Sequence, residues 1–78
     1  MITVFQFRAA RYGIGISLHN LSEMTGISYA TLCKLEQGPL YAFPKLHKTT
    51  LEKLIAFYQT CGVIFESSNI VKVNHPAL

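Results

Sequence analysis

The chain has 78 residues, a length that accommodates one hydrophobic core and no second domain. Half of the residues are apolar, which argues against a disordered regulator, and the net charge of +3 is a mild basic excess that suits a polyanionic partner. No apolar run approaches the ~20 residues of a membrane span. The first residues also lack the pattern of a signal peptide, so we expect a cytoplasmic protein without membrane contact.

The first predicted helix begins after Thr3. Thr3 and Gln6 have the spacing of a capping box, in which each side chain satisfies a free backbone N–H of the other residue. At 100° per residue this helix has one apolar stripe, formed by Phe7, Ala10 and Ile14. Arg11 lies at the edge of the stripe, where a cation needs either an acidic partner or a path to water. Residues 13–15, Gly-Ile-Gly, indicate the end of the helix.

The segment from Leu18 to Gln37 predicts two short helices joined by a turn at Gly26. Ser17 can cap the first of these helices, and Ser28 can cap the second. The first helix has an apolar rhythm of Leu18, Leu21 and Met24, and in the second Leu32 and Leu35 are expected to face inward. Gly26 can adopt the positive φ that ends a helix within one residue. Such a short turn lets two helices pack at a steep angle, the arrangement that presents one helix to the major groove of DNA.

Residues around this turn form a pattern of small, apolar and glycine positions: Leu21, Ser22, Gly26, Ile27, Ser28, Thr31, Leu32, Leu35 and Glu36-Gln37-Gly38. In this pattern the chain resembles the Cro/repressor-like (XRE) family of helix-turn-helix DNA-binding proteins, over about residues 3–62. Ser22 stands where the family usually has Ala, and Leu18 where it often has a phosphate-binding Gln. The resemblance implies that Arg11 pairs with Glu36 and ties the first helix to the end of the third. The residues alone also allow Arg11 to reach water.

The resemblance also implies which residues contact base edges: the first two positions of the third helix and one position a turn later. Here they are Tyr29, Ala30 and Lys34. Lys34 can donate to guanine O6 and N7, and Ala30 can pack on a thymine methyl group. Tyr29 can stack on a sugar or donate to a phosphate or a base. The alternative is that Tyr29 and Lys34 are ordinary surface residues.

Contacts with the DNA backbone are expected around the third helix. A serine at a helix start offers a hydroxyl and backbone N–H groups to an anion. The residues predicted to contact phosphates are Ser17, Ser28, Thr31, Gln37, Gly38, Lys45, His47 and Lys48. The last three belong to a long basic loop after Gly38, in which two prolines discourage a helix. The apolar residues of this loop, Leu40, Phe43 and Leu46, indicate that it folds back on the core, although a basic loop is often simply solvated.

A fourth helix is predicted from Thr49 or Thr50 to residues 61–62, where Gly62 supplies the glycine that ends it. Its apolar face spans an arc of about 160° and consists of Leu51, Leu54, Ile55, Phe57, Tyr58 and Cys61. One core needs an arc of only ~100°. Part of the face is therefore expected to meet a second subunit, unless this is simply the central helix of a small domain.

Two β-branched runs, residues 63–66 and 70–73, flank Ser67-Ser68-Asn69 and predict a β-hairpin. Pairing places Val63, Phe65, Val71 and Val73 on one face, and Glu66 near Lys72 on the other. An isolated two-stranded ribbon is marginal in water, so it must pack on the fourth helix or pair with a second copy. We therefore expect a homodimer, with an interface formed by Leu54, Phe57, Tyr58, Ile70, Val71 and Val73.

The predicted fold is mainly α: a four-helix, lambda-repressor-like helix-turn-helix domain with a C-terminal β-hairpin. The whole chain, 1–78, is expected to be a single domain with a DNA-binding core over about 3–62, the hairpin over about 63–73 and a flexible tail over 74–78. The expected function is sequence-specific binding of double-stranded DNA by a transcriptional repressor. We expect it to bind a palindromic operator on the nucleoid. The alternative is an antitoxin that binds a toxin protein through the hairpin or the fourth helix and autoregulates its promoter.

No residue pattern indicates an enzyme, a cofactor or a metal site. A nucleophile–base pair and a Gly-rich phosphate loop are both missing from the sequence. Cys33 and Cys61 fall in separate predicted helices without a CxxC pair or a His at metal-ligand spacing, so we expect reduced thiols. His47 likewise has no Cys, Asp or second His at useful spacing. The small size leaves no room for a sensor domain, and on that ground we expect no ligand pocket.

Overall fold

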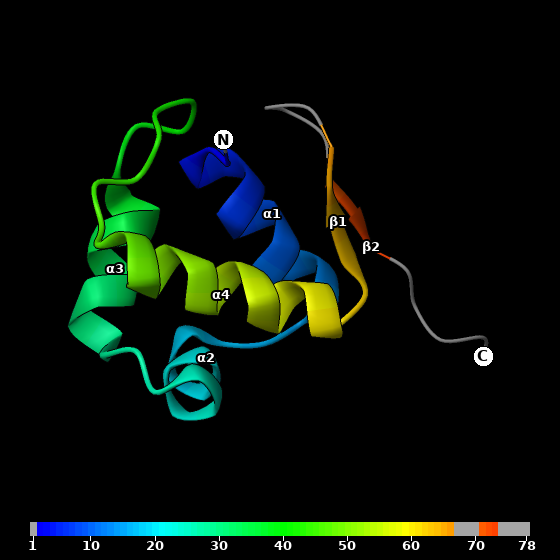
Figure 1. The fold of residues 1–78 in the computed structure, drawn as a ribbon, viewed down its shortest axis with the longest axis horizontal. Coiled ribbons are helices and arrows are strands. Elements are labelled where there is room, and N and C mark those ends of the chain that lie inside the picture. The colour runs from blue at the N-terminus through cyan, green and yellow to red at the C-terminus, as the bar shows by residue number, and fades with distance from the viewer. Residues whose placement is uncertain (1, 67–70, 74–78) are drawn as a thin grey trace.

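In the computed structural model, four helices enclose one core, and a two-stranded antiparallel hairpin closes one side of it (Figure 1). The structure describes residues 2–66 and 71–73. The elements are α1 (Val4–Ile14), α2 (Leu18–Thr25), α3 (Tyr29–Gln37), α4 (Lys48–Thr60), β1 (Val63–Phe65) and β2 (Val71–Val73). The prediction of a mainly α chain with a C-terminal hairpin is confirmed. None of the helices in the described part combines the length and the apolar character needed to cross a membrane.

The helix ends follow the predicted local signals. At the start of α1, the Gln6 amide donates to Thr3 Oγ1 (3.2 Å) and the Thr3 amide donates to Gln6 Oε1 (3.0 Å), which completes the capping box. Gly15 and Gly26 end α1 and α2 with φ values of 72° and 76°. Side chains make this left-handed conformation costly, so glycine lets each helix stop within one residue.

Helix α4 crosses the middle of the molecule (Figure 1) and supplies the centre of its core. Leu54 and Tyr58 are 1% and 0% exposed, because they pack in one core with residues of α1, α2, α3 and β1. Their predicted place in a dimer interface is therefore wrong. The broad apolar face of α4 had two explanations from the sequence, a second subunit or a central position in a small domain. The burial of Leu54 and Tyr58 agrees with the central position. The helix begins at Lys48, just before the predicted start, and the side chain of its N-cap residue, His47, makes no capping hydrogen bond.

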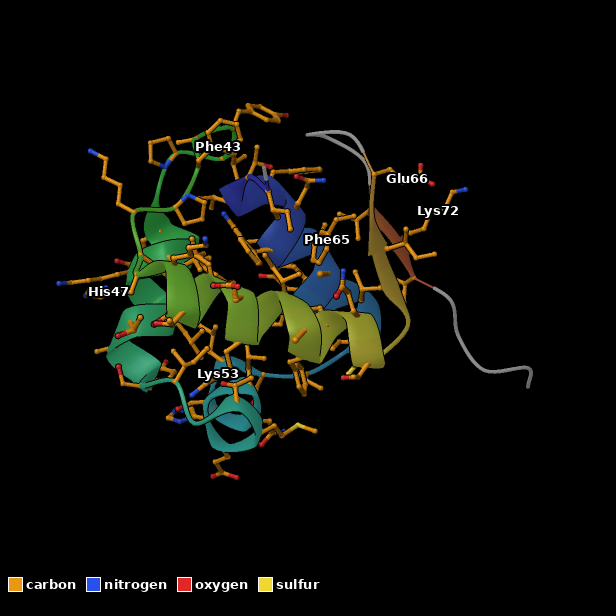
Figure 2. All side chains as sticks on the ribbon, in the orientation of Figure 1. Phe43, His47, Lys53, Phe65, Glu66 and Lys72 are labelled. Atoms are coloured by element: carbon orange, nitrogen blue, oxygen red, sulfur yellow. The ribbon has the colours of Figure 1, made fainter. Side chains whose placement is uncertain are left out.

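The hairpin has the predicted register, with Val63 opposite Val73, Ile64 opposite Lys72 and Phe65 opposite Val71. On its outer face, Lys72 Nζ lies 3.1 Å from Glu66 Oε1, and both side chains are exposed (Figure 2). The predicted turn residues Ser67-Ser68-Asn69, the predicted interface residue Ile70 and the predicted tail 74–78 lie outside the described residues.

The inner face of the hairpin packs on the chain's own core. The Phe65 ring meets the Phe7 ring with centroids 5.8 Å apart, and Val71 and Val73 also contact the core. A Cβ at Gly13 would lie 2.6 Å from Val73 Cγ2, so the missing side chain of Gly13 lets β2 approach α1 this closely. Phe57, Val71 and Val73 were predicted to face a second copy. All three pack, half-buried, against this core: Phe57 from α4, and Val71 and Val73 from the apolar face of the hairpin.

The loop after α3 folds back over the start of α1, as predicted, but it does so mainly through its backbone. The Val4 amide donates to the Ala42 carbonyl (3.0 Å) and the Phe5 amide to the Leu40 carbonyl (2.7 Å). These bonds satisfy two of the N–H groups that a helix start leaves free. Leu40 and Phe43 remain 40% and 47% exposed, so their predicted burial is wrong.

Candidate nucleic-acid interface

Helices α2 and α3, with the three residues between them, form what we call the α2–α3 unit (residues 18–37). Its turn is held by side chains: Ser22 Oγ donates to the Ile27 carbonyl (2.6 Å), and Thr25 Oγ1 accepts from the Ile27 amide (3.3 Å). Ile27 itself is buried in the core. Ser22 thus satisfies a carbonyl of the turn, which an alanine there could not do. Met24, the last residue of the apolar rhythm in α2, is 62% exposed.

The start of α3 is ordered by a second small network. Ser28 Oγ accepts from the Thr31 amide (3.2 Å) and donates to Thr31 Oγ1 (2.7 Å). Ser17 plays the same capping part in α2, accepting from the Asn20 amide (3.1 Å). The three hydroxyls of Ser17, Ser28 and Thr31, predicted to bind phosphates, are therefore already engaged in local hydrogen bonds. Their first contribution to the site is to fix where each helix begins.

Helix α3 has one side in the core and one side in solvent. Leu32, Leu35 and Glu36 are buried. The three residues predicted to contact bases, Tyr29, Ala30 and Lys34, are all exposed. The helix therefore presents an aromatic hydroxyl, a methyl group and an ammonium group from a rigidly seated backbone.

His19 is a residue of this surface that the sequence reasoning missed. Its ring stacks on the Tyr29 ring, with centroids 4.2 Å apart and planes inclined by 5°. The contact joins the first turn of α2 to the first turn of α3. No periodicity signals it, because His19 lies on the exposed side of α2, and only the angle between the two helices brings the rings together.

The Tyr29 phenol also interacts with its own helix. Its interaction with Cys33, one turn further along α3, raises the pKa of the Tyr29 phenol. A tyrosine phenol is protonated at neutral pH even at its ordinary pKa, so it is a hydrogen-bond donor there. The stack on His19 is the contact that orients the Tyr29 ring.

The inner side of α3 is tied to α1 by an ion pair, as the resemblance implied. Arg11 Nε and Nη2 donate to Glu36 Oε2 and Oε1 at 2.7 and 2.9 Å. Arg11 Nη1 also donates to the Ile16 carbonyl (3.0 Å). The hydrogen bond to Glu36 raises the pKa of Arg11. The two side chains are only 11% and 9% exposed, so this pair supports the interface and does not belong to its surface.

The residues predicted for the rim of the interface are dispersed around the end of α3. Gln37, Lys45, His47 and Lys48 are exposed, and His47 lies at the opposite end of the molecule from Lys72 of the hairpin (Figure 2). Gly38 is half-buried, and its amide donates to the Leu35 carbonyl at 3.4 Å. Lys45 belongs to the loop after α3 and Lys48 is the first residue of α4, while the Gly38 amide is used within the chain.

The remaining groups to consider in the described part of the chain are the two thiols and possible metal ligands. Cys33 and Cys61 are free thiols. Within residues 2–66 and 71–73 no group of three or more His, Cys, Asp and Glu side chains could hold a metal ion. The chain matches no protein-family model, no curated protein and no solved structure.

Proposed function

We propose that this chain binds double-stranded DNA sequence-specifically, as a transcriptional regulator of the Cro/repressor-like helix-turn-helix type. The observation that carries the proposal is the two-sided character of α3. Leu32, Leu35 and Glu36 fix its inner side to the core, while Tyr29 and Lys34 are exposed on its outer side. A helix seated in this way next to a shorter supporting helix is the element that enters the major groove.

In this proposal α3 reads the base edges. Lys34 donates to guanine O6 and N7, and the Ala30 methyl packs on a thymine methyl. Tyr29 donates its phenolic proton to a base or a phosphate, from the orientation that the stack on His19 favours. A preoriented side chain loses little conformational entropy on binding, which favours specificity.

Phosphate contacts surround this helix. The starts of α2 and α3, at Ser17 and Ser28, direct backbone N–H groups toward the strands, while Lys45, His47 and Lys48 supply charge and polar groups. Thr31, Gln37 and Gly38 complete the proposed set. Contacts of this kind place the protein on the duplex and make its affinity depend on salt.

One recognition helix covers too few base pairs to select a site among ~10⁶ or more competing sites, so we propose a homodimer on a palindromic operator. Two copies then place their α3 helices about one DNA turn, ~34 Å, apart. Because Leu54 and Tyr58 are buried, we assign the contact to the outer face and edge of the hairpin, where Ile64 is 43% exposed. By occupying a promoter, the dimer represses transcription on the nucleoid.

The antitoxin alternative relied on a free apolar face of the hairpin or of α4. Those faces pack on the chain's own core. No other observation favours a toxin as the partner, and we do not propose that function.

Selection of bound fragments from a random pool of duplex DNA tests the proposal. We expect enrichment of a palindrome with half-sites about one turn apart. Its affinity should exceed that of a scrambled duplex by at least roughly 10³-fold at physiological salt. Equal affinity for selected and scrambled duplexes contradicts sequence-specific binding, and no binding at low salt contradicts any DNA-binding role.

A further inference from the structure

A cavity of about 510 Å³ lies between α3 and the loop that follows it. The expectation of no ligand pocket rested on the small size of the chain alone. The volume falls within the ~300–1,000 Å³ typical of small-molecule sites. The principal lining residues are Val4, Leu35, Phe43 and Leu46, which are apolar, together with Lys34 and Lys45.

The walls of this cavity are fixed by the backbone. The loop carbonyls of Leu40 and Ala42 accept hydrogen bonds from the first turn of α1, and the Ala42 amide donates to the Pro39 carbonyl (3.1 Å). Two prolines, Pro39 and Pro44, restrict the loop further. Figure 2 shows Phe43 in the part of the loop that stands over the start of α1 and the end of α3. The cavity is therefore preformed and does not need a ligand to open it.

The charge of the cavity has one sign. Among the described residues that line it, two are lysines and none is acidic. The ion pairs of the described residues join Arg11 to Glu36 and Lys72 to Glu66, so neither Lys34 nor Lys45 has an acidic partner there. Apolar walls beside two unpaired ammonium groups are complementary to a molecule with a hydrocarbon tail and an anionic head.

We propose that this cavity binds an amphipathic carboxylate of the medium-chain fatty acid class. The tail packs against the accessible apolar lining residues Phe43, Pro44 and Leu46, and the carboxylate lies between Lys34 and Lys45. Resting on the proposed function, the inference extends to regulation: Lys34 cannot serve a ligand carboxylate and a base at the same time. Occupancy of the cavity therefore weakens DNA binding, and DNA weakens ligand binding by the same factor.

Decanoate, titrated into the intact protein without DNA, is the probe. We expect saturable binding at one site by calorimetry, with amide NMR shifts concentrated at Val4, Gly38 and Ala42. Decanol has a similar tail without the charge, and acetate has the charge without the tail, so both should bind at least tenfold more weakly. Absence of saturable decanoate binding, or equal affinity for decanol, overturns the proposal.

Variants locate the site. Lys45→Gln removes one charge-assisted contact and should weaken decanoate binding roughly tenfold, whereas Lys72→Gln, the same change on the distant hairpin, should leave it unchanged. Ala42→Leu should fill the cavity and abolish binding. Far-UV circular dichroism checks that each variant is folded, and the Lys45→Gln comparison is decisive on its own if Ala42→Leu does not fold. An equal loss in Lys45→Gln and Lys72→Gln shows general attraction to positive charge and overturns the site.

A separate measurement tests whether ligand binding weakens DNA binding. Decanoate at saturation should lower the affinity of the wild-type protein for the selected duplex, and should not affect Ala42→Leu, whose DNA contacts are retained. If the chain binds no DNA, the proposed function fails while the ligand site is still judged by calorimetry. If DNA binding holds and decanoate does not bind, the inference alone fails.

Discussion

Arg11 and Glu36 form a two-point ion pair between α1 and the last turn of α3, with nitrogen–oxygen distances of 2.7 and 2.9 Å. The guanidinium also donates to the Ile16 carbonyl, just after α1 ends. One side chain thereby connects α1, the segment before α2 and the end of α3. The position of α3 relative to α1 depends on this contact.

Glu36→Ala should lower the free energy of unfolding by about 3–5 kcal/mol, because it leaves the Arg11 cation poorly solvated and unpaired. Urea denaturation of the variant and the wild type measures the loss. Glu66→Ala breaks the exposed pair with Lys72 and is the matched control, with an expected change within about 0.5 kcal/mol. Equal stability of Glu36→Ala and the wild type contradicts a structural role for the pair.

Tyr58→Phe should leave the protein as stable at pH 7, or more stable by about 1 kcal/mol. The Tyr58 hydroxyl is buried and has no hydrogen-bond partner among the described residues, whereas the unfolded chain exposes it to water. Thermal denaturation of both proteins measures the difference. A loss of more than about 2 kcal/mol would show that the hydroxyl makes a favourable contact.

The same residue makes stability depend on alkaline pH. Burial, with a smaller contribution from the charge of Glu36, raises the pKa of Tyr58 well above its ordinary value. Above pH ~10 the unfolded chain releases this proton and the folded chain keeps it, so stability falls as pH rises. Tyr58→Phe should show a shallower decline than the wild type between pH 9 and 11, whereas Tyr41→Phe, an exposed control, should not. Identical slopes contradict the raised pKa.

Gly13→Ala should destabilise the protein by about 1–3 kcal/mol, although alanine favours a helix more than glycine does. The added methyl group collides with Val73 Cγ2 and moves β2 away from α1. In a Val73→Ala background the collision is absent, and the same substitution should be neutral or stabilising. Chemical denaturation of the four proteins gives the coupling energy, and additive effects would contradict close packing at this point.

Lys34→Ala should weaken binding to the selected duplex and relax the preference at one base pair by roughly 1–3 kcal/mol. Fluorescence anisotropy with selected and scrambled duplexes separates the possible roles. An equal loss on both assigns Lys34 to the phosphates, and no loss on either removes it from the interface. Lys72→Ala, on the hairpin at the far end of the molecule from α3 (Figure 2), is the matched control.

Ile64→Lys should produce folded monomers that lose both operator affinity and preference for a palindrome. Ile64 lies on the outer face of the hairpin, so a charge there opposes pairing of two copies without entering the core. Analytical ultracentrifugation of the wild type and the variant, free and on DNA, measures the number of chains. One wild-type chain per DNA site contradicts the homodimer.

The local features of this chain follow from its sequence. The capping box at Thr3, the serine caps, and the helix ends at Gly15 and Gly26 depend on neighbouring backbone groups only. The register of the hairpin follows from the two-residue period of its side chains. The Arg11–Glu36 pair was suggested by a family resemblance, because no local rule joins residues so far apart in the chain.

Only the tertiary structure decided which apolar and aromatic groups meet. Leu54 and Tyr58 are covered by the chain itself, Met24 is left in solvent, and His19 meets Tyr29 across two helices. A periodic pattern states that a face is apolar, but it does not state whether a helix of the same chain or a second molecule covers it. The answer depends on helix crossing angles and on close approaches such as that of β2 to Gly13, which arise when all the elements pack together.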